Sequence, residues 1–106
     1  MQIYHNPRCA KSRQALAQLQ EAGVEPKVVE YLKTPPTLSQ LQDILEGLNG
    51  DLSLMIREKD LKKDGLEPSL ELLAEQPKYL QRPILIRNKR VSVCRTPEEV
   101  EAFLNC

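Results

Sequence analysis

The chain of 106 residues has little of several residue types, and each scarcity excludes a class of protein. One histidine and three cysteines without a Cys-x-x-Cys pair support neither a zinc site nor a disulfide framework, so we expect free thiols. No glycine stands in the loop before the first predicted helix, which excludes a P-loop. No apolar run approaches the roughly 20 residues that a membrane-spanning helix needs.

The charges balance, since 15 basic and 15 acidic residues give a net charge of zero. We therefore expect no general attraction to nucleic acid or to an anionic membrane. The N-terminus has no signal-peptide pattern, which makes the cytoplasm the expected location. An apolar content of 41% can build a core, and the length suits a single domain over residues 1–106.

The first third of the chain has the pattern of a strand, a loop, a helix and a second strand. The strand at residues 3–4 stops before Pro7, and apolar residues then recur at helical spacing from Ser12 to Gly23. Residues 27–32 are typical of a strand. This order has the length of a βαβ unit, which would pair its two strands in parallel.

The rest of the chain predicts further helices and one hairpin. Thr37 and Gln40 form a capping-box signature for a helix over residues 37–48. The other expected elements are a short helix after Asp51, a loop over 57–67, a helix from Ser69 to about Pro77, a hairpin of strands 84–86 and 91–93, and a helix from Thr96 to Leu104. The predicted fold class is α/β, with a mixed four-stranded sheet and flanking helices.

Cys9 is the leading candidate for chemistry. It lies between the first strand and the first helix, where a thiol faces unpaired helix N–H groups. Arg8, Lys11 and Arg13 surround it, His5 precedes it, and the first acidic residue of the chain is Glu21. These features favour the thiolate, so we expect a pKa for Cys9 below the usual value of about 8.5. The competing interpretation is a buried structural cysteine.

The zero net charge hides a basic stretch. Six basic residues and no acidic residue stand between Lys78 and Arg95, of which Arg82 and Arg95 flank the predicted hairpin. The two flanks can share one sheet edge with Cys9, and guanidinium groups suit tetrahedral oxyanions. Each of these arginines could instead be a solvated flank. With Cys9, they predict a nucleophilic sulfur that attacks a bound oxyanion.

Several other sites built on a cysteine do not fit. A phosphotyrosine-type phosphatase needs an arginine six residues after the nucleophile, but residue 15 is alanine. A thioredoxin-type dithiol needs a second cysteine at position 12, where this chain has serine. Ser12 cannot form a disulfide, although its hydroxyl could hydrogen-bond the Cys9 thiolate.

The segment His5-Asn6-Pro7-Arg8-Cys9-Ala10-Lys11-Ser12-Arg13 resembles the active-site segment of glutaredoxin-coupled arsenate reductases. Further matches follow in the family's order, at Leu54-Met55-Ile56-Arg57, Gln81-Arg82-Pro83-Ile84 and Cys94-Arg95-Thr96-Pro97. The segment Tyr31-Leu32-Lys33-Thr34-Pro35-Pro36 also looks like this family. The resemblance covers nearly the whole chain, and it implies a thioredoxin-like fold with a cis-proline at Pro83.

The resemblance also implies roles for individual residues. Cys9 would attack arsenate, and Arg57, Arg82 and Arg95 would bind the oxyanion. Ser12 would hydrogen-bond the thiolate, while His5 and Arg13 would help to keep it ionised. Glutathione would be the co-substrate, glutaredoxin would reduce the resulting mixed disulfide, and no bound cofactor or metal would be needed.

Two departures from the family pattern concern specificity. Ala10-Lys11 replaces a Gly-Thr pair, and the stretch between Arg57 and Arg82 is shorter than usual. Two alternatives therefore stay open, a thiol transferase with little use for arsenate and a redox regulator of the Spx kind. For the other cysteines, we expect Cys94 to pack at a strand end and Cys106 to be incidental.

Overall fold

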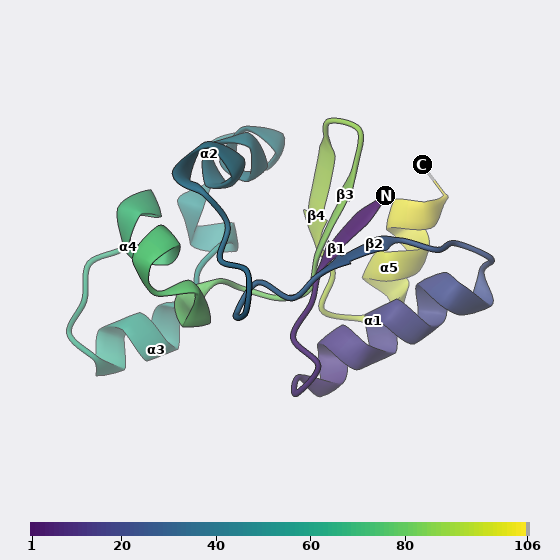
Figure 1. Cartoon of the computed structure of the whole chain (residues 1–106), viewed down its shortest axis with the longest axis horizontal. Coiled ribbons are helices and arrows are strands. Elements are labelled where there is room, and N and C mark those ends of the chain that lie inside the picture. The colour runs from purple at the N-terminus through teal and green to yellow at the C-terminus, as the bar shows by residue number, and fades with distance from the viewer. Residues whose placement is uncertain (106) are drawn as a thin grey trace.

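The computed structural model describes residues 1–105 as one sheet with helices on both sides (Figure 1). The elements are β1 (Gln2–Tyr4), α1 (Ala10–Glu21), β2 (Lys27–Val29), α2 (Leu38–Gly47), η1 (Leu52–Leu54), α3 (Glu58–Lys63), α4 (Leu70–Glu75), η2 (Pro77–Tyr79), β3 (Ile84–Arg87), β4 (Arg90–Val93) and α5 (Pro97–Leu104), where η marks a 3₁₀ turn. Cys106, which we expected to be incidental, lies outside the described residues.

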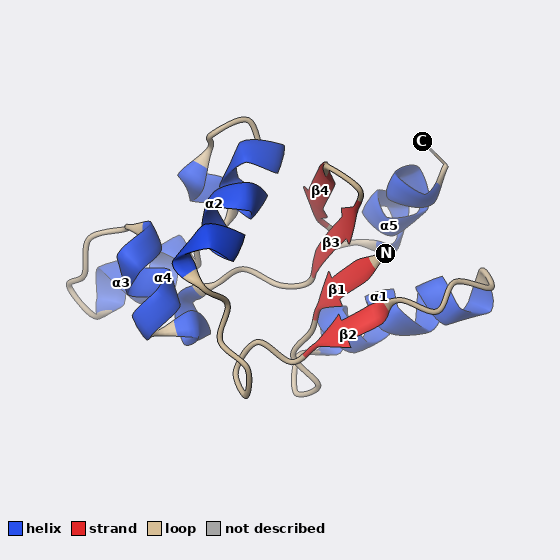
Figure 2. Cartoon of the chain, turned by 45° about the horizontal axis from the view of Figure 1, so that its top comes forward, coloured by secondary structure: helices blue, strands red, loops and turns tan. Residues whose placement is uncertain are grey.

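The sheet is mixed and four-stranded, as predicted, and its strand order is β2-β1-β3-β4 (Figure 2). β1 pairs in parallel with β2, and antiparallel with β3 in a register that sets Tyr4 against Ile84. β3 and β4 form the predicted hairpin, and Asn88 in its turn has a φ of 58°. The carboxyl ends of β1 and β2 therefore lie at the same sheet edge as the start of β3 and the end of β4.

Each face of the sheet buries its own apolar cluster. Helices α1 and α5 cover one face, and their core contains Ile3, Leu19, Leu85 and Phe103 among its fully buried side chains. Helices α2, α3 and α4 lie on the other side, as Figure 2 shows, around a larger cluster that includes Tyr31. Burial of these apolar surfaces is the main force that holds the helices against the sheet.

Most of the predicted helix starts are confirmed. Thr37 and Gln40 form both hydrogen bonds of the capping box, and Asp51, Ser69 and Thr96 cap the elements that follow them. The predicted loop over 57–67 is wrong in part, because α3 forms there around the buried side chain of Leu61. The second strand is also shorter than predicted, since the chain turns after Val29.

A short backbone pairing closes the segment that contains α3 and α4. Ile56 and Leu80 form an isolated antiparallel bridge. The N–H of Arg57 donates to the carbonyl of Tyr79 at 2.8 Å, and the N–H of Gln81 donates to the carbonyl of Met55 at 2.6 Å. The bridge thus holds Arg57 next to the stretch that leads into Arg82. The Arg82–Pro83 peptide bond is cis, as the resemblance implied.

Within residues 1–105, no helix has both the length and the apolar character needed to cross a membrane.

Gly47 is the point where α2 meets β4 most closely. A Cβ at this position would overlap the side chain of Val91, with 2.9 Å to its Cβ. We expect Gly47→Ala to lower the free energy of unfolding by about 1–2 kcal/mol, because overpacking outweighs the better helix propensity of alanine. Urea unfolding followed by circular dichroism measures this. In a Val91→Ala background the cost should largely vanish, and an equal cost in both backgrounds would contradict the packing argument.

Candidate active site

Cys9 stands at the N-cap position of α1. Its backbone N–H donates to the carbonyl of Asn6 at 3.0 Å, and its carbonyl accepts from the N–H of Arg13 at 3.0 Å. The side chain makes no capping hydrogen bond and is partly exposed. The sulfur is therefore held at the positive end of a 12-residue helix and remains accessible to a ligand.

The groups around the sulfur favour its ionised form. Burial raises the pKa of the Cys9 thiol, but the backbone N–H of Ser12, the Arg82 guanidinium and the backbone N–H of Lys11 outweigh this effect. The pKa therefore lies below its ordinary value. The Arg82 guanidinium favours the thiolate, although Arg82 is remote from Cys9 in the sequence.

Arg82 and Arg95 reach this edge because of the sheet topology. Arg82 precedes β3, whose first residue pairs with the last residue of β1, and Arg95 follows β4. The Arg95 guanidinium donates from Nη1 to the carbonyl of Arg82 at 2.6 Å. The Nε of Arg82 is buried and has no hydrogen-bond partner within residues 1–105. A buried guanidinium N–H without a partner is a donor available to an anion.

Arg57 approaches the same region from the other side. The bridge between Ile56 and Leu80 holds it, and its Nε lies 3.1 Å from the carboxylate of Asp60. Arg57, Gln81 and Arg95 line one surface pocket of about 530 Å³. The three predicted arginines thus lie in one region, since Arg57 and Arg95 share this pocket, Arg95 binds the Arg82 carbonyl, and the Arg82 guanidinium lowers the pKa of Cys9.

His5 and Ser12 form a buried polar pair behind the loop. His5 Nδ1 lies 2.6 Å from the Ser12 hydroxyl oxygen, which also accepts from the N–H of Asn6 at 3.0 Å. The pKa of His5 is lowered, mainly by burial. Glu30 opposes this effect and Arg13 adds to it, so the ring is neutral at pH 7. The hydrogen bonds that the structure records for the Ser12 hydroxyl are to His5 and Asn6, whereas its backbone N–H faces the sulfur.

The remaining cations of the loop divide into two kinds. Arg13 donates from Nη1 to the carbonyl of Pro7 at 2.9 Å, so it braces the loop rather than contacting the sulfur. The side chains of Arg8 and Lys11 are exposed. In the later basic stretch, Arg87 and Arg90 donate to the carbonyl of Phe103 and stack over its ring, which gives them a structural role at the end of α5.

Sequence reasoning assigned no role to Tyr31. Its side chain is 1% exposed, and the groups that act on its hydroxyl are Asn6, Arg82, Cys9 and Arg57. Its position in the sequence could have indicated a role, because Tyr31 follows a strand that runs parallel to the strand before Cys9. A strand end next to the candidate nucleophile is a place where a polar side chain reaches the same edge.

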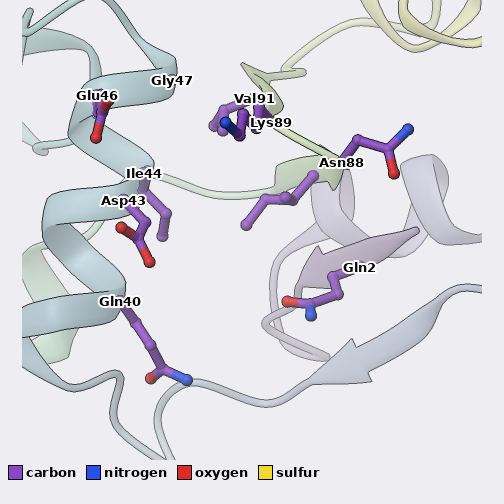
Figure 3. Close-up of a pocket in the computed structure, with 10 residues that line it drawn as sticks. Gln2, Gln40, Asp43, Ile44, Glu46, Gly47, Asn88, Lys89 and Val91 are labelled. Carbon is purple, nitrogen blue, oxygen red and sulfur yellow. The ribbon is translucent and has the colours of Figure 1, made fainter.

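Other features of the chain lie apart from this edge. A pocket of about 650 Å³ opens between α2 and the sheet, and Figure 3 shows Gln40, Asp43 and Ile44 on one side and Gln2 on the other. None of the candidate site residues lines it.

Cys94 is buried, as predicted, and burial raises the pKa of its thiol. Residues 1–105 contain no group of His, Cys, Asp and Glu that could hold a metal ion.

The lowered pKa of Cys9 predicts its reactivity. Alkylation of Cys9 by iodoacetamide should reach half its maximal rate below pH 8.5, about the midpoint of a free cysteine, because the thiolate persists to lower pH. Arg82→Ala should move this midpoint upward. Mass spectrometry of the peptide that contains Cys9 follows the reaction separately from the other thiols. Arg8→Ala, which removes a neighbouring exposed charge, should move it less, and equal shifts would contradict the role of Arg82.

Comparison with known proteins adds to this geometry. The profile described as "ArsC family" matches residues 4–103. The chain is 40% identical over 110 residues to "Uncharacterized protein YfgD" of Escherichia coli K12, covering 94% of this chain and 92% of that protein. It is 43% identical over 114 residues to "Arsenate reductase" of Neisseria meningitidis serogroup A, covering 98% and 97%.

A solved structure agrees with these sequence matches. "Arsenate reductase from Vibrio cholerae" superposes with a TM-score of 0.82 at 34% identity, covering 95% of this chain and 94% of that one. The mixed four-stranded sheet with flanking helices is thus the thioredoxin-like fold of these proteins. The matched profile spans most of the chain and includes Cys9 and the three arginines. This chain therefore belongs to the ArsC family.

Proposed function

We propose that this protein reduces arsenate to arsenite with glutathione as co-substrate, through Cys9 as nucleophile. The observation that carries the proposal is the buried Nε of Arg82, which has no hydrogen-bond partner in the described chain and belongs to the guanidinium that lowers the pKa of Cys9. A thiolate beside an available guanidinium donor can attack an oxyanion and stabilise the charge that develops. Because the His5 ring is neutral, it adds no positive charge to favour the thiolate, and that role falls to Arg82.

The first step forms a bond between the Cys9 sulfur and arsenic. One arsenate oxygen leaves as water after it has taken up two protons. Arg82 and Arg95 donate hydrogen bonds to the remaining oxygens, and Arg57 neutralises charge from the pocket that it shares with Arg95. The thiol–arsenate adduct still contains arsenic in its oxidised form.

The second step is the reduction. The sulfur of glutathione bonds to the Cys9 sulfur, the bond between sulfur and arsenic breaks, and its electron pair stays on arsenic, which leaves as arsenite. Arsenic gains two electrons, and the two thiols lose one each to become a mixed disulfide. Glutaredoxin then takes the glutathionyl group by thiol–disulfide exchange and restores the Cys9 thiol. A second thiol in this loop is not needed, which fits serine at position 12.

The coupled reductase assay tests this proposal. Arsenite formation from arsenate, glutathione and glutaredoxin should be readily measured for the wild type and absent for Cys9→Ser. Arg82→Ala should lower kcat/KM for arsenate by about 100- to 1,000-fold, since one lost oxyanion donor costs about 2.7–4 kcal/mol. Lys89→Ala, at the exposed turn of the hairpin, should match the wild type. Equal activity in the wild type and Cys9→Ser, or no activity in either, would contradict the proposal.

A thiol transferase that acts on glutathione mixed disulfides is the second candidate. One observation favours it: the exposed Lys11, where the family has threonine, changes the charge beside the nucleophile. Such an enzyme would use the activated thiolate without an oxyanion site.

The two candidates differ in their dependence on Arg82. For a thiol transferase, deglutathionylation of a small mixed disulfide should proceed at the same rate in wild type and Arg82→Ala, when both are assayed at a pH where Cys9 is ionised. The rate is followed by coupling to glutathione reductase. A large loss in this assay would argue against the thiol transferase, and Cys9→Ser provides the blank.

A further inference from the structure

The fold places Tyr31 at the edge of the sheet that carries Cys9. The strand before it, β2, runs parallel to β1, and the N–H of His5 donates to the carbonyl of Val29 at 2.8 Å just beyond the paired residues of β1. The chain then turns, because the N–H groups of Lys33 and Thr34 both donate to the carbonyl of Glu30 at 2.9 Å. This turn directs the Tyr31 side chain into the protein, where it is 1% exposed.

The surroundings of the Tyr31 hydroxyl come from both halves of the site. The side chain packs in the apolar cluster beneath α2, α3 and α4. Besides burial, the pKa of its hydroxyl is shifted by the charges of Arg82, Cys9 and Arg57 and by the side chain of Asn6. The cluster around the ring includes Ile56 and Ile84, which are close in the sequence to Arg57 and Arg82. A phenol this deeply buried normally finds a hydrogen-bonding partner, and here the candidates are the residues of the proposed site.

We propose that Tyr31 is a positioning residue of this site, whose hydroxyl lies behind the pair of Cys9 and Arg82 and holds the Arg82 guanidinium in place for oxyanion attack. This inference rests on the proposed function, because it assigns Tyr31 a part in the same reaction. The same hydroxyl also interacts with Asn6, whose backbone N–H binds the Ser12 hydroxyl. Tyr31 thus connects the loop before α1 to the segment before β3.

A phenol suits this position better than the other side chains that bind arginine. Burial raises the pKa of Tyr31, and although Arg82 opposes this effect the net change is upward, so the hydroxyl stays neutral at physiological pH. A neutral oxygen can accept a hydrogen bond from the guanidinium without cancelling its positive charge. A carboxylate at this place would instead raise the pKa of Cys9 and repel the oxyanion.

Tyr31→Phe tests the proposal, since it keeps the ring that packs in the core and removes only the hydroxyl. We expect kcat with arsenate to fall about 10- to 100-fold, which is less than the loss expected when a direct oxyanion donor is removed. The KM for glutathione should change little. The midpoint of Cys9 alkylation should move to higher pH, a readout that a purely structural role would leave unchanged.

Tyr4→Phe is the matched control. Tyr4 is also a buried tyrosine, 3% exposed, but Asp43 on α2 is the charged group that acts on its hydroxyl. This variant should keep the wild-type kcat and the wild-type alkylation profile. Urea unfolding of both variants shows whether the loss of either hydroxyl changes the free energy of unfolding.

A double variant tests whether Tyr31 acts through Arg82. In an Arg82→Ala background, Tyr31→Phe should have little further effect on the alkylation midpoint, whereas independent effects would add. Wild-type values for Tyr31→Phe in both the reductase assay and the alkylation profile would overturn the inference, as would full additivity. If Tyr31→Phe does not fold, 3-fluorotyrosine can replace Tyr31, since it keeps the hydroxyl but lowers the pKa of that hydroxyl. Reductase activity should then decline at a lower pH than in the wild type. An unchanged pH profile would overturn the inference.

Failure of this inference and failure of the proposed function are distinguishable. If the wild type forms no arsenite, the proposed function fails. The alkylation profiles of Tyr31→Phe and Tyr4→Phe need no arsenate, so they still decide whether Tyr31 acts on the pair of Cys9 and Arg82.

Discussion

The antiparallel pairing of β1 with β3 is the constraint on which the candidate site depends. It sets Tyr4 against Ile84, so the loop that leaves β1 and the segment that enters β3 lie at one edge. Cys9 and Arg82 come from these two segments, and their interaction joins positions far apart in the sequence. A shift of this register by one residue would move Arg82 along the edge and turn the core side chains of β3 to the opposite face.

The electrostatics of the site are local rather than global. The chain as a whole carries no net charge, yet the Cys9 sulfur meets helix N–H groups and a guanidinium, and the buried His5 ring is neutral. Burial alone would favour the thiol, so these specific donors decide its protonation state. Such short-range interactions are screened less by salt than the interactions of exposed charges, because the groups are partly removed from water.

Much of the fold was predictable from the sequence because its signals are local. The caps at Thr37 and Thr96, the hairpin turn at Asn88 and the break at Pro7 each act within a few residues. The helix over residues 58–63 was missed, since it is short, largely charged and stabilised by burying Leu61 against other segments. Tertiary packing overrode the local pattern there.

The candidate site was predictable in part. Cys9 was identified from its position and neighbours, and Arg82 and Arg95 from a basic stretch that flanks two strands. The sequence did not indicate that Arg87 and Arg90 belong to the end of α5, nor that the Ser12 hydroxyl binds His5 and Asn6. These contacts depend on which way side chains point once distant elements have packed, and no spacing rule encodes that.

The bridge between Ile56 and Leu80 has a consequence for how this protein can vary. It joins the two ends of residues 58–78, so α3 and α4 form an excursion that begins and returns at nearly the same place. Because the entropy of closing a loop grows only slowly with its length, residues can be gained or lost in the exposed connection between α3 and α4, over residues 64–68, at small energetic cost. The backbone on either side of residues 58–78, next to Arg57 and Arg82, is held by the bridge. Evolution can therefore change the length of this connection while it leaves the arginines where they are.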